Sequence, residues 1–384
     1  MTVPQTVNRL DFTVFGANGP FRQSSIQEFF NPTNSTPPFF QVFDSRFLAI
    51  LGPNPSIRSI ASDPTFAFAH EAPIWLPDTD EFTFSSNDGG ALGRSDINHN
   101  NQVAKISLKQ AQEALKETSG VKPVNVTVTK LDLPDTVQMN NGGTGPLNGS
   151  LLLITSGRGP LPPSIVLSNP KPPFTTRVLL DNFFGRQFNS LNDIKIHPVS
   201  KKIFFTDAPY GFVNQFRPPL LLPNQVYRFD PSTGSVRVVA DGFNKCNGIA
   251  FSQDGKSAFI SDTGVNSGVF GIDQTAPATI YKFDVEPQTQ AFINRRVFAY
   301  IDTGIPDGLQ LDTKGNVYTG TGDGVQVRLS TMKVFAPDGT LLGKFFIGTT
   351  SANMAFAGKG RLVILGETSI FLAEIAASGF NLAH

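Results

Sequence analysis

The residues best suited to chemistry in this sequence are asparagines and aspartates that stand just before short apolar segments. Asn192, Asn247 and Asp307 occupy this position in three similar stretches, and Asn353 occupies it in a fourth, degenerate one. Each apolar segment is typical of a β-strand followed by a turn and a second strand. Amide and carboxylate oxygens are hard donors, which suit calcium better than a soft metal. The alternative is that these residues only begin strands, because asparagine and aspartate favour turns.

The recurrence of these stretches indicates the architecture. They follow one another at intervals of roughly 50 residues, which is typical of one hairpin-rich propeller blade. Glu71 stands at the corresponding position of a further stretch, and Asn141 stands before a strand expected over 149–155. The sequence therefore predicts an all-β protein with a six-bladed β-propeller. Because the innermost strands of a propeller line a central channel, side chains in phase at their starts are expected to meet at one end of the axis. This expectation favours a cation site over the turn interpretation.

The composition agrees with many short strands and excludes several classes of protein. The chain has 384 residues with 35 Phe, 35 Gly and 29 Pro, which is typical of half-buried sheets joined by turns. The formal net charge is zero, so there is no electrostatic case for nucleic acid or an anionic membrane as partner. We expect a small-molecule partner, and the oligomeric state stays open. The single cysteine, Cys246, excludes an intramolecular disulfide and a cysteine-based zinc site, and we expect it to be buried.

The chain divides into two parts of very different length. Residues 1–45 are rich in proline and phenylalanine, and we interpret them as an N-terminal arm packed on the propeller. Residues 46–384 are expected to form the propeller, with a first strand region over 43–51. One short inserted helix is predicted over 108–118, with its charges in solvent. The glycine-rich segment 87–93 is expected to be a loop at the channel mouth.

The sequence leaves the compartment of the protein open. It has no run of about 18 apolar residues, so we expect no membrane-spanning helix. The N-terminus lacks a basic region followed by an apolar one, and we therefore expect no signal peptide. Three N-glycosylation sequons, at Asn34, Asn125 and Asn148, matter only for a secreted protein. The chain is expected to be cytoplasmic as written, and secreted if a leader has been removed.

Several strings, taken in order and in blade phase, resemble a known family. They are HEAPIW at 70–75, FGRQFNSLND at 184–193, NGI at 247–249, IPDG at 305–308 and GDGV at 322–325. With these strings the chain resembles the gluconolactonase, regucalcin and lactonohydrolase superfamily of six-bladed propellers. It is most similar to the fungal-type lactonohydrolases, and the similarity covers most of the chain after the arm.

This resemblance implies a metal-dependent lactonase, with calcium or a similar divalent cation at the channel floor. By position it assigns the cation to Glu71, Asn192, Asn247 and Asp307, and it gives Asp307 an additional role as general base. His70, which lies beside Glu71, is implied to be a second base or an orienting hydrogen-bond donor. Lactone hydrolysis develops an oxyanion, and a divalent cation stabilises that charge and lowers the pKa of bound water.

Four further residues are assigned to substrate binding. Asn141 and Asn353 stand at the remaining strand starts, and Tyr210 follows a string shared with the family. Arg186 lies on the loop that carries Asn192, where its guanidinium would bind a polar or anionic group of the substrate. The alternative for Arg186 is a surface ion pair.

Two other functions stay open, because one fold hosts many reactions. The phenylalanine content, the lack of a visible leader, and departures from the fungal lactonohydrolases around 139–141 and 328–330 leave room for a non-hydrolytic enzyme. Such an enzyme would be a cyclase or cycloaddition catalyst of fungal secondary metabolism. The third interpretation is a protein-binding propeller with a structural calcium. Removal of the metal should silence the hydrolase, and a protein-binding propeller should keep its function when the channel floor is mutated.

Overall fold

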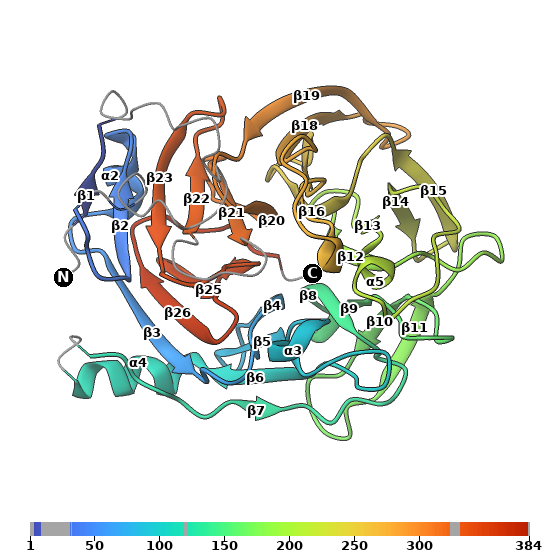
Figure 1. Cartoon of the computed structure of the whole chain (residues 1–384), viewed down its shortest axis with the longest axis horizontal. Coiled ribbons are helices and arrows are strands. Elements are labelled where there is room, and N and C mark those ends of the chain that lie inside the picture. The colour runs from blue at the N-terminus through green and yellow to red at the C-terminus, as the bar shows by residue number, and fades with distance from the viewer. Residues whose placement is uncertain (1–3, 9–30, 32, 119–121, 323–330, 383–384) are drawn as a thin grey trace.

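The chain folds into a ring of six β-sheets around a central axis (Figure 1). The structure is a computed structural model, and it describes residues 4–8, 31, 33–118, 122–322 and 331–382. Each sheet is one blade, in which four successive strands pair antiparallel, and the innermost strands of neighbouring blades contact one another around the ring. The predicted six-bladed, mainly-β propeller is therefore confirmed.

The first three blades follow an up-and-down order from the axis to the rim. Blade 1 consists of β4 (Glu71–Leu76), β5 (Glu81–Ser85), β6 (Val103–Ser107) and β7 (Thr129–Lys130). Blade 2 consists of β8 (Asn140–Leu147), β9 (Ser150–Thr155), β10 (Ser164–Ser168) and β11 (Thr176–Leu180). Blade 3 consists of β12 (Leu191–Ile196), β13 (Ile203–Asp207), β14 (Gln225–Asp230) and β15 (Ser235–Ala240).

The remaining blades follow the same order, except that the outer strand of the last blade comes from the N-terminal part of the chain. Blade 4 consists of β16 (Cys246–Phe251), β17 (Ser257–Asp262), β18 (Thr279–Val285) and β19 (Phe292–Tyr300). Blade 5 contains β20 (Ile305–Leu311), β21 (Val317–Gly322), β22 (Thr331–Phe335) and β23 (Leu341–Phe346). Blade 6 consists of β24 (Met354–Phe356), β25 (Arg361–Leu365), β26 (Ser369–Glu374) and β3 (Ser56–Ser62).

The ring is closed by strand pairing between distant parts of the chain. β3 pairs antiparallel with β26, so blade 6 joins N-terminal and C-terminal segments. β2 (Phe39–Val42) pairs with β23, and β1 (Gln5–Thr6) pairs parallel with β2, which extends blade 5 outward. The described residues of the predicted arm thus add strands to one blade. The division of the chain at residue 45 stays a prediction.

Helices are short and lie between strands. α4 (Leu108–Glu117) agrees with the helix predicted over 108–118, and the hydroxyl of its N-cap, Ser107, accepts a hydrogen bond from the backbone of Gln110. The described residues also contain short helical segments that the sequence did not predict. These are α2 (Arg46–Leu51), α3 (Gly90–Gly93), α5 (Tyr210–Val213) and the 3₁₀ turn η2 (Gly268–Phe270).

The strand expected over 43–51 was wrong. This segment forms α2 because Phe47, Ile50 and Leu51 recur at helical spacing and are all buried. They pack into the cluster between blades 5 and 6, where the ring of Phe47 meets that of Phe345 edge-on, with centroids 5.8 Å apart. A helix here buries three apolar side chains on one face, which a strand of alternating faces would not do.

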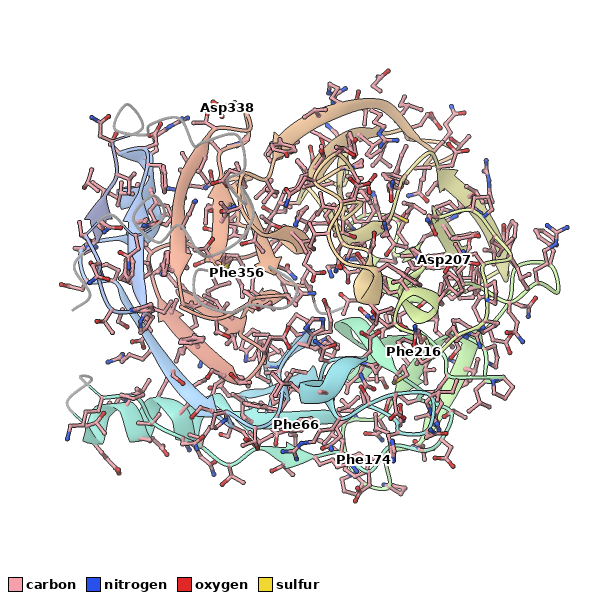
Figure 2. The ribbon with its side chains drawn as sticks, viewed as in Figure 1. Phe66, Phe174, Asp207, Phe216, Asp338 and Phe356 are labelled. Carbon is pink, nitrogen blue, oxygen red and sulfur yellow. The ribbon has the colours of Figure 1, made fainter. Side chains whose placement is uncertain are left out.

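The hydrophobic core is divided among the blade interfaces, each of which holds its own cluster of buried apolar residues. Between blades 3 and 4, Phe204 stacks on Phe292 with centroids 5.6 Å apart and meets Phe251 edge-on at 5.0 Å. Cys246 is buried in the same cluster, as predicted. Figure 2 shows side chains filling the spaces between blades, with Asp338 on the rim and Phe356 nearer the axis.

Two sequence features lie outside the described residues. The GDGV string has only its first residue, Gly322, within a described strand, and the departure around 328–330 falls outside entirely. In the part of the chain that is described, no helix is long and apolar enough to cross a membrane.

Candidate metal centre and active site

A break in strand pairing turns a polar residue toward the axis at the start of the inner strands. The register between the inner strand and its neighbour shifts next to the predicted donor in blades 1 to 5. A bulge of this kind releases a residue from the ladder and re-aims its side chain. In blade 6 the donor directly precedes the strand. The six residues are Glu71, Asn141, Asn192, Asn247, Asp307 and Asn353.

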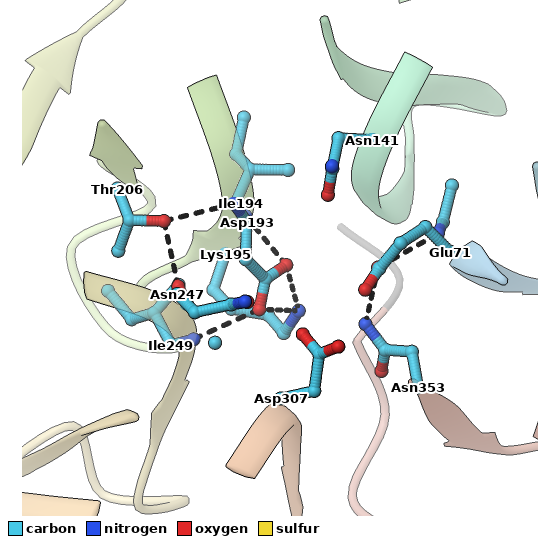
Figure 3. A network of polar contacts seen from close by, with 12 residues as sticks. Glu71, Asn141, Asp193, Ile194, Lys195, Thr206, Asn247, Ile249, Asp307 and Asn353 are labelled. Atoms are coloured by element: carbon cyan, nitrogen blue, oxygen red, sulfur yellow. Dashed lines mark hydrogen bonds and ion pairs between the residues drawn. The ribbon is translucent and has the colours of Figure 1, made fainter. Parts of the chain in front are cut away.

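Two carboxylates from different blades come together here with a histidine. One ligand atom each of His70, Glu71 and Asp307 lie within 4.8 Å of one another. Asn353 donates from Nδ2 to Oε2 of Glu71 at 2.7 Å (Figure 3). Nδ1 of His70 forms a 2.5 Å hydrogen bond with Oε1 of Glu367. The Nδ1 side of the imidazole is thus occupied by Glu367, and Nε2 is left for the site.

Three amide oxygens of the same ring lack a hydrogen-bond partner among the described residues. They are the Oδ1 atoms of Asn141, Asn192 and Asn247, and all three side chains are buried. Nδ2 of Asn141 donates to Oδ2 of Asp88 at 2.8 Å, which leaves only its oxygen free. A buried carbonyl oxygen without a partner is costly, and a hard cation is the group that would satisfy it. The donor set of amide and carboxylate oxygens therefore fits calcium.

Burial and neighbouring charges shift the pKa values of the site. Burial raises the pKa of Glu71 well above its usual range, and the charge of Asp307 raises it further. Burial also raises the pKa of Asp307, although His70 opposes this. Burial alone would lower the pKa of His70, but the charge and hydrogen bond of Glu367, together with Glu71 and Asp307, raise it to about 10. Two carboxylates this close repel each other, so the site favours positive charge between them.

Asp193 shows that a carboxylate near the axis is not always available to a cation. It forms an ion pair with Lys195, whose Nζ lies 2.9 Å from Oδ1, and both side chains are buried. It also accepts the backbone N–H of Ile194 at 2.7 Å and that of Ile249, in the next blade, at 3.0 Å. These contacts satisfy its oxygens and tie blade 3 to blade 4, as Figure 3 shows beside the carboxylates of the site.

The remaining predicted residues differ in their distance from this centre. Tyr210 is buried in α5, and its hydroxyl shares a hydrogen bond with Thr263. Burial raises the pKa of Tyr210, and the nearby side chain of Asn247 opposes this. Arg186 is exposed, on a turn closed by backbone hydrogen bonds to Phe183. No described residue of the site forms a hydrogen bond or ion pair with the guanidinium of Arg186. The structure thus places Tyr210, but not Arg186, near predicted ligands.

Two acidic residues of the site were not predicted. Glu367 lies on the turn between β25 and β26, and a backbone bridge to Ala69 brings it to His70 from the neighbouring blade. Asp88 lies in the segment 87–93, which the sequence placed at the channel mouth, and its Oδ2 also accepts the hydroxyl of Ser156 at 3.1 Å. The glycines of the segment 87–93 could have indicated Asp88, because they predicted a loop at the channel mouth. The pairing of Glu367 with His70 depends on blade packing alone and left no such signal.

The fold and this ring of donors define a class of protein, and the sequence comparison agrees. The family described as SMP-30/Gluconolactonase/LRE-like region matches residues 70–365. The chain belongs to this family, as the resemblance predicted.

Individual relatives cover nearly the same part of the chain. Lactonohydrolase oryL of Aspergillus oryzae is 30% identical over 327 residues, which are 82% of this chain and 68% of that protein. A gluconolactonase structure from Xanthomonas campestris has a TM-score of 0.66 at 22% identity, covering 88% of this chain and 95% of the other. Regucalcin from Agrobacterium tumefaciens, a calcium-binding protein, has a TM-score of 0.60 at 15% identity, covering 85% and 96%. The last two likenesses concern the fold.

Proposed function

We propose that this protein is a calcium-dependent lactonase that opens the ring of its substrate by hydrolysis at the start of the inner strands. The observation that carries the proposal is the pair of carboxylates, buried Glu71 and half-buried Asp307, with ligand atoms within 4.8 Å of each other and of His70. Membership of a family that includes lactonohydrolases and gluconolactonases supports the reaction class.

Glu71, Asn192, Asn247 and Asp307 hold the cation in this proposal. The unpartnered amide oxygens of Asn192 and Asn247 support it, because neither has another described group to satisfy it. Asn141 has an equally free oxygen and joins the set as a further donor. Two carboxylates and a few neutral oxygens leave room for water and substrate in the shell of calcium. When bound, the ion would polarise the lactone carbonyl and stabilise the oxyanion.

The chain supplies the proton transfers. Water attacks the carbonyl carbon while Asp307 takes up its proton as general base, and the bond between that carbon and the ring oxygen then breaks. The departing alkoxide takes a proton from His70, which the contact with Glu367 holds charged and oriented. The proton on Asp307 returns to the histidine, so the enzyme is restored and one water has been consumed. The product is a hydroxy acid.

Substrate contacts complete the proposal. Asn141 and Asn353 flank the carboxylates, as Figure 3 illustrates, and their amide groups are suited to the ring oxygen or to a hydroxyl of the substrate. Tyr210 lies near Asn247, whose side chain influences the pKa of the phenol. Arg186 would contact only a substrate long enough to reach the exposed loop around 181–187.

Linked loops surround the end of the propeller that carries the carboxylates. Their exposed apolar side chains favour a substrate with an apolar substituent. Nη1 of Arg217 donates to the carbonyl oxygens of Gly159 and Leu161 at 2.6 and 2.9 Å, and Nη1 of Arg158 donates to that of Ile97 at 2.8 Å. These contacts join the loops that follow the second strands of blades 1, 2 and 3. Large apolar side chains are exposed on these loops and on the equivalent loop of blade 4: Leu92, Ile97, Leu161, Phe212, Leu221, Val269 and Phe270.

Labelled water tests the reaction and separates it from the non-hydrolytic alternative. The protein is incubated in H₂¹⁸O with calcium and a set of γ- and δ-lactones that carry either alkyl or hydroxylated substituents. Hydrolysis incorporates one ¹⁸O into the new carboxylate, and we expect faster turnover of the alkyl lactones. A chelator should abolish the reaction. Turnover without ¹⁸O incorporation, or full activity after metal removal, would overturn the proposal.

A further inference from the structure

A second cavity opens at the other end of the axis, away from the carboxylates. It has a volume of about 560 Å³ and lies among the inner strands β4, β8, β20 and β24 and the C-terminal segment. That volume is within the range of small-molecule sites, roughly 300–1,000 Å³. The C-terminal segment reaches the middle of the ring (Figure 1) and is fixed there by a backbone bridge between Gly379 and Asp312. The fold thus provides a second concave surface, independent of the site proposed above.

Three aromatic side chains form part of the walls of this cavity. Trp75, Phe356 and Phe380 line it, and each is only half-buried, so their rings face the open volume. Trp75 is held in place by a 2.9 Å hydrogen bond from Nε1 to Asp80 and by the guanidinium of Arg361, 5.7 Å from its ring. Such walls are suited to a flat or alkyl group of roughly ten carbon atoms.

Two of the polar residues in the lining, Gln310 and Lys359, indicate the chemistry of the other half of a ligand. The side chain of Gln310 is 6% exposed, and within the described residues its amide forms no hydrogen bond, so it faces the cavity unpartnered. Lys359 is exposed at the rim, and none of the described carboxylates forms an ion pair with it. The neighbouring cation, Arg361, differs because Asp80 neutralises it at 2.7 Å. The amide of Gln310 is therefore free to form hydrogen bonds with a polar group bound in the cavity.

We propose that this cavity is a binding site for a small apolar carboxylate, with its hydrocarbon part between Trp75, Phe356 and Phe380 and its carboxylate on Lys359 and Gln310. An anion is favoured because Lys359 provides a free positive charge and the amide of Gln310 provides donors. The donors of the proposed catalytic centre face the opposite end of the inner strands. Binding here is therefore separate from hydrolysis, and either proposal can fail without the other.

The experiment uses the only tryptophan of the chain as its reporter. Because Trp75 is that residue, its fluorescence, excited at 295 nm, reports occupancy of this cavity and of no other site. The probe is 3-phenylpropionate, and the matched control is 3-phenylpropionamide, which has the same shape without the charge. We expect a saturable change in emission with the acid and at least about tenfold weaker binding of the amide. No saturable change, or equal binding of acid and amide, would overturn the proposal.

Two variants locate the ligand more closely. In Lys359→Met the acid should bind about as weakly as the amide, and in Gln310→Leu both probes should bind more weakly. Asp307→Asn serves as the matched control at the other end, and it should leave the titration unchanged. Unaltered binding of the acid to Lys359→Met would contradict the proposed contact, and so would loss of binding in Asp307→Asn. Circular dichroism of each variant establishes that the propeller is intact.

Discussion

The two ends of the axial channel are built from the same inner strands but have opposite chemistry. At the end where these strands begin, polar side chains converge, and two carboxylates lie with a histidine within 4.8 Å. At the end where they finish, the lining is mostly apolar, with aromatic and aliphatic side chains, glycine and proline, and its polar residues include Gln310 and Lys359. The difference arises at the bulge in each inner strand, because the bulge turns a donor inward at one end only. A single set of strands can therefore present a cation site and an apolar cavity a few residues apart.

Two histidines illustrate the same contrast. His70, at the site end, has its pKa raised to about 10 despite burial, because carboxylates surround it. His197 lies in the turn at the opposite end of blade 3, where burial lowers its pKa. Its Nδ1 accepts the backbone N–H of Ser200 at 3.1 Å, and Nε2 faces the carbonyl of Gly255 at 2.9 Å, so the neutral ring is the form that fits. Local charge, and not burial, decides the protonation state at the site end.

The largest effect is expected at Asp307, whose substitution tests most directly whether the two ends of the channel have different roles. Asp307→Asn keeps the size of the side chain but removes the base, and kcat for lactone hydrolysis should fall about 10³-fold. Lys359→Met changes a charge at the other end and should leave kcat unchanged. Steady-state kinetics of both variants decides this, and retention of more than a tenth of the activity by Asp307→Asn would remove Asp307 from the mechanism.

Calcium should stabilise the folded protein through the same residues. At a free calcium concentration one hundred times its Kd, the free energy of unfolding should rise by about 2.7 kcal/mol. Denaturant unfolding with calcium and with chelator measures this. The gain should be lost in Glu71→Gln and kept in Glu117→Gln, whose side chain is exposed on α4. An equal gain in both variants would place the calcium elsewhere.

Glu367 is expected to act through His70. Glu367→Gln keeps a hydrogen-bonding side chain but removes the charge beside the imidazole, and we expect kcat to fall roughly tenfold with KM little changed. The matched control is Glu374→Gln, in the same blade, where the carboxylate pairs with Arg58. If both variants keep full kcat, the contact of Glu367 with His70 serves packing only.

The smallest effect concerns the pH dependence of stability that arises from His197, at the end of blade 3 opposite the carboxylates. Burial lowers the pKa of His197 in the folded state, so its contribution to stability is present above the unfolded value of about 6.5 and is lost as the pH falls below it. His70 titrates in the opposite direction, because its pKa is raised in the folded state, so the comparison of wild type and variant isolates His197. As the pH falls from 7.5 to 5.5, the melting temperature of the wild type should fall relative to that of His197→Asn. A steeper decrease in the variant would contradict this assignment.

In the inner strand of blade 2, tertiary packing overrode the local sequence preference. The strand expected over 149–155 is β9, the second strand of blade 2, and the inner strand is β8, with the sequence NNGGTGPL. Glycine and proline weaken strands, but a Cβ on Gly142 would lie 2.7 Å from the carbonyl oxygen of Asn192 and one on Gly143 would lie 3.0 Å from Ile74. The close approach of neighbouring inner strands demands these glycines, and no single stretch of sequence reveals that approach.

The sequence alone determined the number of blades and the polar residues at the starts of the inner strands, because strand, turn and polar start repeat with a regular period. It also determined that these donors are hard oxygen groups, since that follows from residue type. Only the tertiary structure decided which distant groups meet. Glu367 contacts His70 across a blade interface, β3 closes the ring with β26, and aromatic residues from three separate segments form the second cavity. These contacts join residues far apart in the chain, and their partners are selected by packing between blades, which leaves no local periodic signal.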